Sequence, residues 1–191
     1  EKQPSTPGYV RLTECDVWTS DDHGLTWTEK GNSKCVSDHT LVALSDDTVL
    51  LLGGYTYSPD VSVPDKYWNF VVLSDDKGET WEEIVSHAEW SARSGHAAVA
   101  LSNDSIVLIA GRLENDVWRS ENKGATWREM GHAPWSKRNG HSSTVLPDNS
   151  IVLMGGYDGD NYLNDVWRST DGGKNWTEMT GSAEWDARSG H

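Results

Sequence analysis

Basic side chains are scarce in this sequence of 191 residues, which carries 16 Lys and Arg against 30 Asp and Glu and a net charge of −14. Proteins that bind a nucleic-acid backbone need clustered Lys and Arg, so we expect no nucleic-acid partner. The same acidity disfavours binding to an anionic membrane surface. Long apolar runs are also missing. None approaches the roughly 20 residues that a spanning helix needs, so we expect no membrane insertion.

Phenylalanine is nearly absent, with one Phe against eleven Trp. The tryptophans are explained by a repeat, because four stretches share one pattern: "TSDDHGLTW", "LSDDKGETW", "RSENKGATW" and "RSTDGGKNW". These stretches end at Trp27, Trp81, Trp127 and Trp176, which lie 46 to 54 residues apart. Two further landmarks keep this spacing: a glycine pair or its variant after an apolar run, and an Arg-x-Gly-His segment that ends at His96, His141 and His191. A period near fifty residues is typical of a repeat architecture.

The last complete unit predicts four β-strands and no helix. Its segments "SSTVL", "IVLMGG", "DVWRS" and "NWTEM" are β-branched, apolar or aromatic, and "PDNS" between the first two is a turn sequence. The run "IVLMGG" is continuously apolar, which indicates a strand buried on both faces. Four antiparallel strands per unit of this length describe the blade of an all-β propeller.

The landmarks divide the chain into about three and a half blades, as one propeller segment over 1–191. The predicted parts are a partial blade of two outer strands at 9–31, blades at 39–84, 96–130 and 141–179, and a crossover at 180–191. An open propeller exposes sheet edges and an apolar blade face. We therefore expect either a piece of a longer protein or an assembly that supplies the missing blades.

The glycine pair, the later Trp and the Arg-x-Gly-His crossover resemble kelch repeats, the class that includes the galactose-oxidase propeller. The turn between the third and fourth strands resembles the Asp-box of sialidases and sortilin-type receptors. The resemblance covers nearly the whole chain and implies a propeller fold. It says little about function, because propellers host many functions.

The resemblance and the repetition together favour a structural role for the four turns. The acidic side chain is expected to accept backbone N–H groups of its own turn, Gly to supply a positive φ, and Trp to pack between sheets. Asn122, at the acidic position of the third copy, can accept the same hydrogen bonds. The structural Asp-box residues are Ser20, Asp22, Gly24, Trp27, Ser74, Asp76, Gly78, Trp81, Ser120, Asn122, Gly124, Trp127, Ser169, Asp171, Gly173 and Trp176.

Cys15 and Cys35 both lie in the first unit. They predict a disulfide across a hairpin, with two free buried thiols as the alternative. Two sequons, at Asn103 and Asn175, are candidates for glycosylation. With the acidic composition, these features favour an extracellular or cell-surface location.

The loops after the glycine pair differ most between units, and unlike residues mark a binding site better than repeated ones. Residues 55–68 and 157–162 combine aromatic rings with carboxylates, which suits sugar rings and equally suits a protein interface. The remaining interpretation is a loop packed on its own blade. The candidate binding residues are Tyr55, Tyr57, Asp60, Asp65, Tyr67, Trp68, Tyr157, Asp158, Asp160 and Tyr162.

Asp158 and Asp160 hint at a calcium loop, but the later ligands of an EF-hand loop are missing, so we assign no metal and no cofactor. Arg93, Arg138 and Arg188 recur once per blade. This repetition favours a structural role, in which they bond to backbone carbonyls or to an adjacent blade, over the binding of a ligand carboxylate by three arginines, as in sialidases. For the histidines of the same segments we expect a carboxylate or a backbone group as the partner of the ring, with zinc binding as the alternative. We find no catalytic constellation in this chain and assign no catalytic residue.

The sequence thus favours a non-catalytic extracellular propeller that binds a protein partner, further copies of itself or its remaining blades. A glycan-binding propeller is the alternative. A third hypothesis is part of a sialidase-like or galactose-oxidase-like glycan-processing enzyme, with an active site partly outside this chain.

Overall fold

The computed structural model describes residues 14–20, 22–58, 62 and 64–191, and all regular elements in this part of the chain are β-strands. The strands form one two-stranded and three four-stranded antiparallel sheets, so the predicted all-β fold of propeller blades is confirmed. Blade 1 contains β1 (Glu14–Thr19) and β2 (Thr28–Lys34), and blade 2 contains β3 (Thr40–Ala43), β4 (Val49–Thr56), β5 (Lys66–Ser74) and β6 (Glu82–Val85). Blade 3 contains β7 (Ala97–Ala100), β8 (Ile106–Gly111), β9 (Glu114–Ser120) and β10 (Arg128–His132), and blade 4 contains β11 (Ser142–Val145), β12 (Ile151–Tyr157), β13 (Tyr162–Ser169) and β14 (Thr177–Thr180).

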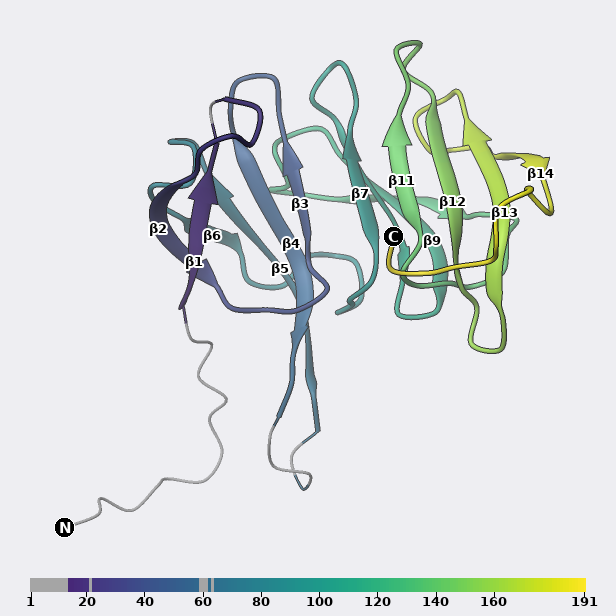
Figure 1. The fold of residues 1–191 in the computed structure, drawn as a ribbon, viewed down its shortest axis with the longest axis horizontal. Coiled ribbons are helices and arrows are strands. Elements are labelled where there is room, and N and C mark those ends of the chain that lie inside the picture. The colour runs from purple at the N-terminus through teal and green to yellow at the C-terminus, as the bar shows by residue number, and fades with distance from the viewer. Residues whose placement is uncertain (1–13, 21, 59–61, 63) are drawn as a thin grey trace.

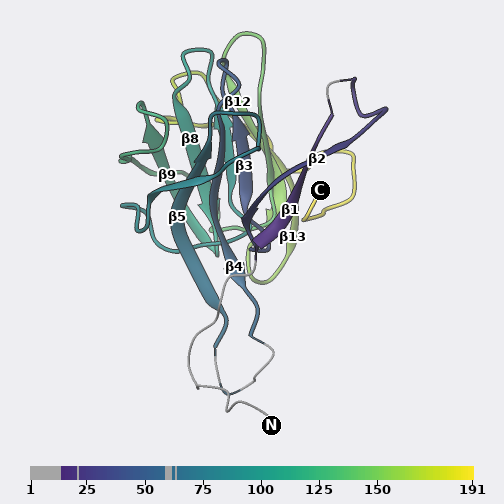
Figure 2. The ribbon, with the colours of Figure 1, turned by 90° about the vertical axis from the view of Figure 1, so that its left-hand side faces the viewer.

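The blades lie side by side in a row, with blade 1 and blade 4 at its two ends (Figures 1 and 2). Their first strands β3, β7 and β11 are neighbours. Because the strands alternate in direction, the loops between second and third strands share one end of the row with the crossovers between blades. We call this end the loop face. The opposite end, which we call the turn face, carries the four turns that end at Trp27, Trp81, Trp127 and Trp176, named here the tryptophan turns.

The hydrophobic core lies between the blades. One cluster joins Leu50 and Leu52 of blade 2 to Ile106 and Leu108 of blade 3, and a second joins blade 3 to Ile151 and Leu153 of blade 4, all of them buried. Every residue of β8 is buried, as its continuous apolar run predicts for a strand covered on both faces. In β12 burial alternates, because only one face of blade 4 is covered by another described blade.

Each tryptophan turn is closed by local hydrogen bonds. In the first, the Ser20 hydroxyl accepts the Gly24 N–H at 2.7 Å, and Asp22 accepts the Thr26 N–H at 2.8 Å and its hydroxyl at 2.6 Å. Hydrogen bonds to the Asp22 carboxylate lower its pKa to about 2, and the bond from the Thr26 hydroxyl has the largest effect. Asn122 accepts the Thr126 N–H at 3.0 Å in the equivalent place.

In the second, third and fourth tryptophan turns, the glycine packs on the preceding blade. A Cβ at Gly124 would lie 2.9 Å from Leu50 Cδ2 and from Val71 Cγ1, and its φ is +79°. No larger residue fits this approach without displacing the blade. Trp127 is accordingly 6% exposed, whereas Trp27 is 58% exposed because no described blade precedes it.

A buried ion pair joins consecutive blades. Arg93, in the crossover after blade 2, is 0% exposed and donates to both carboxylate oxygens of Asp116 on β9, at 2.6 and 2.7 Å. Its Nη1 also donates to the Ala110 carbonyl at 2.8 Å. Burial alone would raise the pKa of Asp116, but the hydrogen bonds and charge of Arg93 outweigh it and hold that pKa below its usual value.

The same pair recurs between blades 3 and 4, where Arg138 donates to Asp165 at 2.8 and 2.7 Å. Between blades 1 and 2 the two positions hold Val36 and Phe70, and Val36 packs against the cluster that contains Phe70. Both positions are therefore apolar in this interface, and no buried charge is left without its partner.

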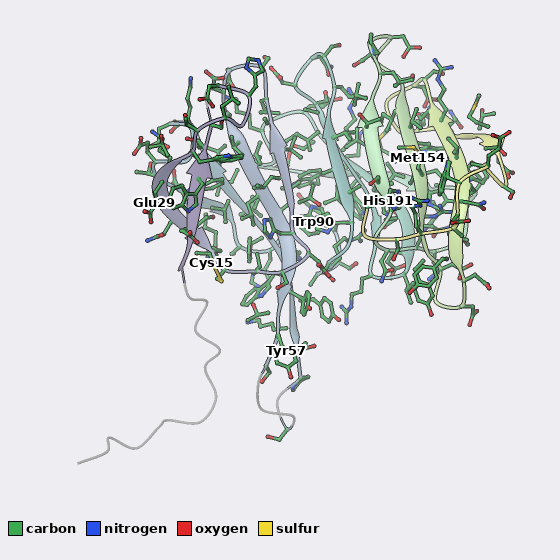
Figure 3. All side chains as sticks on the ribbon, viewed as in Figure 1. Cys15, Glu29, Tyr57, Trp90, Met154 and His191 are labelled. Atoms are coloured by element: carbon green, nitrogen blue, oxygen red, sulfur yellow. A yellow bond between two sulfur atoms is a disulfide. The ribbon has the colours of Figure 1, made fainter. Side chains whose placement is uncertain are left out.

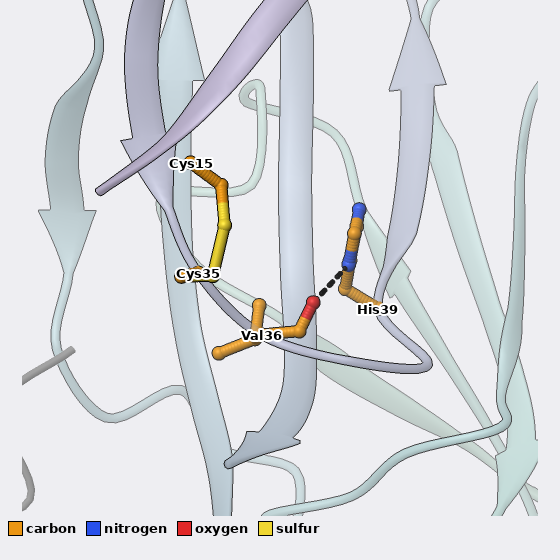
Figure 4. The surroundings of a disulfide bond; sticks show 4 residues. All are labelled: Cys15, Cys35, Val36 and His39. Atoms are coloured by element: carbon orange, nitrogen blue, oxygen red, sulfur yellow. Dashed lines mark hydrogen bonds between the residues drawn. A yellow bond between two sulfur atoms is a disulfide. The ribbon is translucent and has the colours of Figure 1, made fainter. Parts of the chain in front are cut away.

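The disulfide bond joins Cys15 on β1 to Cys35, which directly follows β2 (Figure 4). It lies beside the turn in which His39 Nδ1 is 2.8 Å from the Val36 carbonyl oxygen. The bond closes a loop between residues 20 positions apart. A cross-link of this span stabilises a fold by about 3 kcal/mol in the chain-entropy description.

We expect Asp116→Ala to lower the free energy of unfolding by about 3–5 kcal/mol, because it leaves the buried Arg93 charge without its partner. The double variant Arg93→Val/Asp116→Phe, which copies the Val36–Phe70 pair, should recover most of that loss. Urea unfolding measures both. The control Arg168→Ala removes a partly exposed ion pair with Asp148 and should cost about 0–1 kcal/mol. A double variant no more stable than the single one would contradict this interpretation.

Candidate functional site

Aromatic rings gather where the β4–β5 hairpin reaches the loop face. Tyr55 and Tyr67 are direct cross-strand partners, and their rings stack with centroids 5.8 Å apart. Trp68 Nε1 donates to the Thr56 hydroxyl at 2.9 Å. Tyr57, near the end of this hairpin, is 65% exposed (Figure 3). Three rings are thus held by the hairpin while the fourth projects toward solvent.

A second aromatic pair occupies the β12–β13 hairpin. Tyr157 and Tyr162 face each other across the strands with ring centroids 5.3 Å apart, and Tyr162 is 62% exposed. The loop between them is closed by Asp158, which accepts the N–H groups of Asp160 at 2.9 Å and Asn161 at 2.7 Å. The bond from Asn161 is the largest cause of a lowered pKa at Asp158.

The short β8–β9 turn joins the two aromatic pairs. Gly111 pairs with Glu114, so Arg112 and Leu113 form a two-residue hairpin loop with φ of 49° and 59°. The Arg112 guanidinium lies 4.0 Å from the centre of the Tyr67 ring. On the other side, a Cβ at Gly159 would lie 3.6 Å from Leu113 Cδ1. The result is one strip, which we call the aromatic strip: Tyr55, Tyr57, Tyr67, Trp68, Arg112, Leu113, Tyr157 and Tyr162.

This turn conformation is strained. A two-residue loop with both φ values positive is normally built from Asn, Asp and Gly, because other side chains clash with the backbone there. Arg and Leu occupy it here and place a cation against an aromatic ring and a 37% exposed leucine on the face. Strain of this kind is concentrated at functional sites.

A recess of about 320 Å³ lies beside the strip, where the crossovers enter the first strands. Hydrogen bonds link the crossovers in order: Gly95 N–H to the Asp38 carbonyl at 3.0 Å, Gly140 N–H to Gly95 at 2.8 Å, and Gly190 N–H to Gly140 at 2.7 Å. The recess adjoins the tyrosine pairs, since Ser37 and Asn139 exchange backbone hydrogen bonds with Tyr55 and Tyr157. Recess and strip therefore form one surface.

Two of the histidines that line the recess are almost fully buried. His96 and His141 are each 6% exposed, and their ring nitrogens make no hydrogen bonds of ordinary geometry within the described structure. Burial and then the charge of Arg93 lower the pKa of His96 to about 3, and burial and then Arg138 do the same for His141. Both rings are therefore neutral and serve as packing groups.

Several predicted site residues have local partners. The Asp65 carboxylate accepts the Ser58 N–H at 2.9 Å, as Asp158 does within its own loop, whereas Asp160 is exposed. Asp60 lies outside the described residues. In the part of the chain that the structure describes, no group of three His, Cys, Asp or Glu side chains is placed to hold a metal ion.

The two sequon asparagines differ in their environment. Asn103 lies exposed in the turn between β7 and β8 and accepts the Ser105 N–H at 3.2 Å through its side-chain oxygen. The Asn175 side-chain nitrogen, the atom to which a glycan would attach, donates to Asp171 at 2.7 Å. Glycosylation would thus disturb the fourth tryptophan turn but not the turn at Asn103.

Sequence reasoning missed Arg112 and Leu113. Their loop is the shortest of the three and contains no aromatic residue. The sequence offers one indication of an unusual turn. The segment "GRLEND" is too short for a long loop, yet it lacks the Asn-Gly or Asp-Gly that two-residue hairpin loops normally contain. The contact of Arg112 with Tyr67 crosses from blade 3 to blade 2, so no local pattern contains it.

Comparisons with known proteins agree with this architecture. Residues 38–191 match the KLHDC2/KLHL20/DRC7 Kelch-repeats domain. The solved structure of YjhT has a TM-score of 0.72 at 14% sequence identity, over 93% of this chain and 62% of that one. A xyloglucanase of Paenibacillus sp is 29% identical over 133 residues, which are 66% of this chain and 12% of the enzyme. The chain thus spans less than two thirds of either protein.

Replacing the strained turn should stabilise the protein. We expect Arg112→Asn/Leu113→Gly to raise the free energy of unfolding by about 1–2 kcal/mol, because these residues adopt positive φ at lower cost. The control Arg112→Ala keeps the strained backbone and should give no gain. Urea unfolding compares the variants. A less stable double variant would show instead that the contacts with Tyr67 and Gly159 outweigh the strain.

Stability should fall on the acid side of neutrality. His96 and His141 have folded pKa values of about 3, below the value of about 6.5 in the unfolded chain, so the unfolded state binds protons that the folded state does not. The stabilisation is complete above about pH 6.5 and is lost toward pH 3, by about 1.4 kcal/mol per pH unit for each histidine.

Urea unfolding between about pH 6.5 and pH 4.5 isolates this effect, since unfolded carboxylates titrate mainly below that range. We expect His96→Phe to reduce the slope by about half and the exposed control His132→Gln to leave it unchanged. An equal slope in His96→Phe would contradict the assignment.

Proposed function

The chain belongs to the Kelch-repeat family of the KLHDC2/KLHL20/DRC7 type, whose domains generally mediate protein–protein interactions, and from this premise we propose that its loop face binds a protein partner. The observation that carries the proposal is the aromatic strip. Tyr, Trp and Arg are the residues most enriched at binding hot spots, and the strip combines five tyrosines, a tryptophan and a stacked arginine.

The strip has the physical properties of a binding surface. Apart from Tyr57, its rings are held by cross-strand pairing and by Arg112, so these rings lose little side-chain entropy on binding. Tyr57 and Tyr162 project from its two ends and are well exposed. The recess beside it offers backbone groups and the rings of His39 and His191 to a partner's polar atoms. The net charge of −14 favours a basic partner.

We place this function in an oxidising compartment, outside the cell or at its surface. The Cys15–Cys35 disulfide supports this location, because such bonds persist mainly in secreted and extracellular proteins. The hydrogen bonding of the tryptophan turns also supports their assignment as Asp-box turns with a structural role.

A glycan-binding function is the second candidate. Sugar rings stack on exposed aromatic faces such as Tyr57 and Tyr162, and one relative is named a xyloglucanase. That similarity spans only 12% of the enzyme, so a glycan-processing activity would need residues beyond this chain. The protein-binding function is preferred because the family match covers residues 38–191.

The experiment screens the chain against a displayed peptide library and a glycan array, using wild type, Tyr57→Ser/Tyr162→Ser and the control Leu25→Ser. Leu25 is 85% exposed on the turn face. We expect peptides that bind wild type and the control, and that bind the double variant at least about tenfold more weakly. Peptide binding unchanged in the double variant would contradict the site. Selective glycan binding lost in that variant would favour the lectin function instead.

A further inference from the structure

Two arginines face each other beside the tryptophan turn of blade 3. Arg119 on β9 and Arg128 on β10 are direct cross-strand partners, so both side chains leave the same face of the sheet. Like charges directly opposite each other destabilise a sheet, and an anion between them removes that cost. The equivalent pairs of the other three blades contain at most one basic residue: Thr19 and Thr28, Leu73 and Glu82, Arg168 and Thr177.

The two arginines line a recess of about 290 Å³ beside this turn. Arg119 is fixed on one side, because its Nη2 donates to the Ser105 hydroxyl at 3.0 Å and a Cβ at Gly172 of blade 4 would lie 2.6 Å from its Nη1. Its Nε is buried without a hydrogen-bond partner in the described structure. Arg128 is exposed and has no hydrogen bond or ion pair with the described residues. Both guanidinium groups thus keep N–H donors for a ligand.

The acidic groups near the recess leave it positively charged. Glu121 is the one acidic residue among the described side chains that line it, against two arginines. Its exposed carboxylate lies 3.3 Å from Arg119 Nη2, and an ion pair so open to water contributes little. The turn itself carries the neutral Asn122 where the other three turns carry an aspartate. A local excess of positive charge in a chain of net charge −14 favours an anionic ligand at this point.

The third turn also frees a hydroxyl donor. In the first turn the Thr26 hydroxyl donates to Asp22 at 2.6 Å, and the second turn repeats this bond. In the third turn the Asn122 side-chain nitrogen donates to the Thr126 hydroxyl oxygen at 2.9 Å. The amide keeps this orientation because its oxygen accepts the Thr126 N–H at 3.0 Å. The hydroxyl hydrogen of Thr126, which lines the recess, is therefore available to an acceptor there.

We propose that this recess binds a tetrahedral oxyanion, a phosphate or sulfate group, between the guanidinium groups of Arg119 and Arg128, with the Thr126 hydroxyl as a further donor. Hydrogen bonds from a guanidinium to such an anion are charge-assisted, and its planar fork matches two oxygens at once. The first strand of blade 3 contacts those of blades 2 and 4, so both neighbours of this blade belong to the described structure (Figure 1). The site lies at the turn face and is separate from the aromatic strip.

The test is a titration of the chain with inorganic phosphate, inorganic sulfate or chloride at matched ionic strength. Heteronuclear NMR follows the Thr126 amide and the Nε–H groups of Arg119 and Arg128. We expect saturable shifts with phosphate or sulfate at a Kd of about 1–10 mM, and none with chloride. The anion that binds more tightly identifies the group on the ligand. The Thr80 amide, whose turn keeps its aspartate, should not shift.

Two variants separate this site from general attraction to basic side chains. Arg128→Gln removes one guanidinium and should weaken binding about tenfold. Asn122→Asp adds a negative charge and engages the Thr126 hydroxyl, so it should weaken binding at least about tenfold. Its unfolding midpoint should be at or above the wild-type value, because aspartate stands there in the other turns. The control Arg168→Gln removes a guanidinium from blade 4 and should bind as wild type does.

The absence of saturable shifts with both phosphate and sulfate would overturn the proposal. Binding by Asn122→Asp that equals that of wild type would do the same. So would equal weakening in Arg128→Gln and Arg168→Gln, because the anions would then respond to the overall charge of the chain and not to this recess.

Discussion

The buried arginine–carboxylate pair between consecutive blades is the interaction on which the rest of the structure depends. A guanidinium without exposure to water is tolerated only if its charge and donors are satisfied, and Asp116 and the Ala110 carbonyl do this for Arg93. The pair joins a crossover to the third strand of the next blade and so fixes how the two sheets are placed. Between blades 1 and 2, where the charged pair is absent, Val36 and Phe70 occupy both of its positions, so no buried charge is left without a partner there.

Contacts that recur in each blade leave the loop face free to vary. The second to fourth tryptophan turns pack on the preceding blade, the crossovers link to each other, and the core lies between sheets. The loops between second and third strands do not take part in the clusters between blades 2, 3 and 4. Their residues differ from blade to blade, and Arg112 connects two of them through its contact with Tyr67. A scaffold of repeated contacts thus carries a surface that is not repeated.

The sequence predicts what depends on neighbouring residues and misses what depends on distant ones. The all-β fold follows from apolar runs and turns, and the hydrogen bonds of each tryptophan turn stay within about five residues. The partner of Arg93 lies 23 residues away on another sheet, so repetition indicated a structural role but not Asp116. The aromatic residues were found by their type. The strip they form depends on Arg112 and Leu113, whose backbone conformation their identity does not favour. Asp65 and Asp158 were grouped with the rings, whereas backbone N–H groups engage both.

The most direct test of the loop face is a hydrogen–deuterium exchange footprint of the chain with and without a bound partner peptide. The account predicts slowed exchange in the β4–β5 and β12–β13 hairpins and at Arg112 and Leu113, with the tryptophan turns unchanged. Slowing confined to the tryptophan turns, with no change in those hairpins, would contradict it and place binding on the opposite end of the blades.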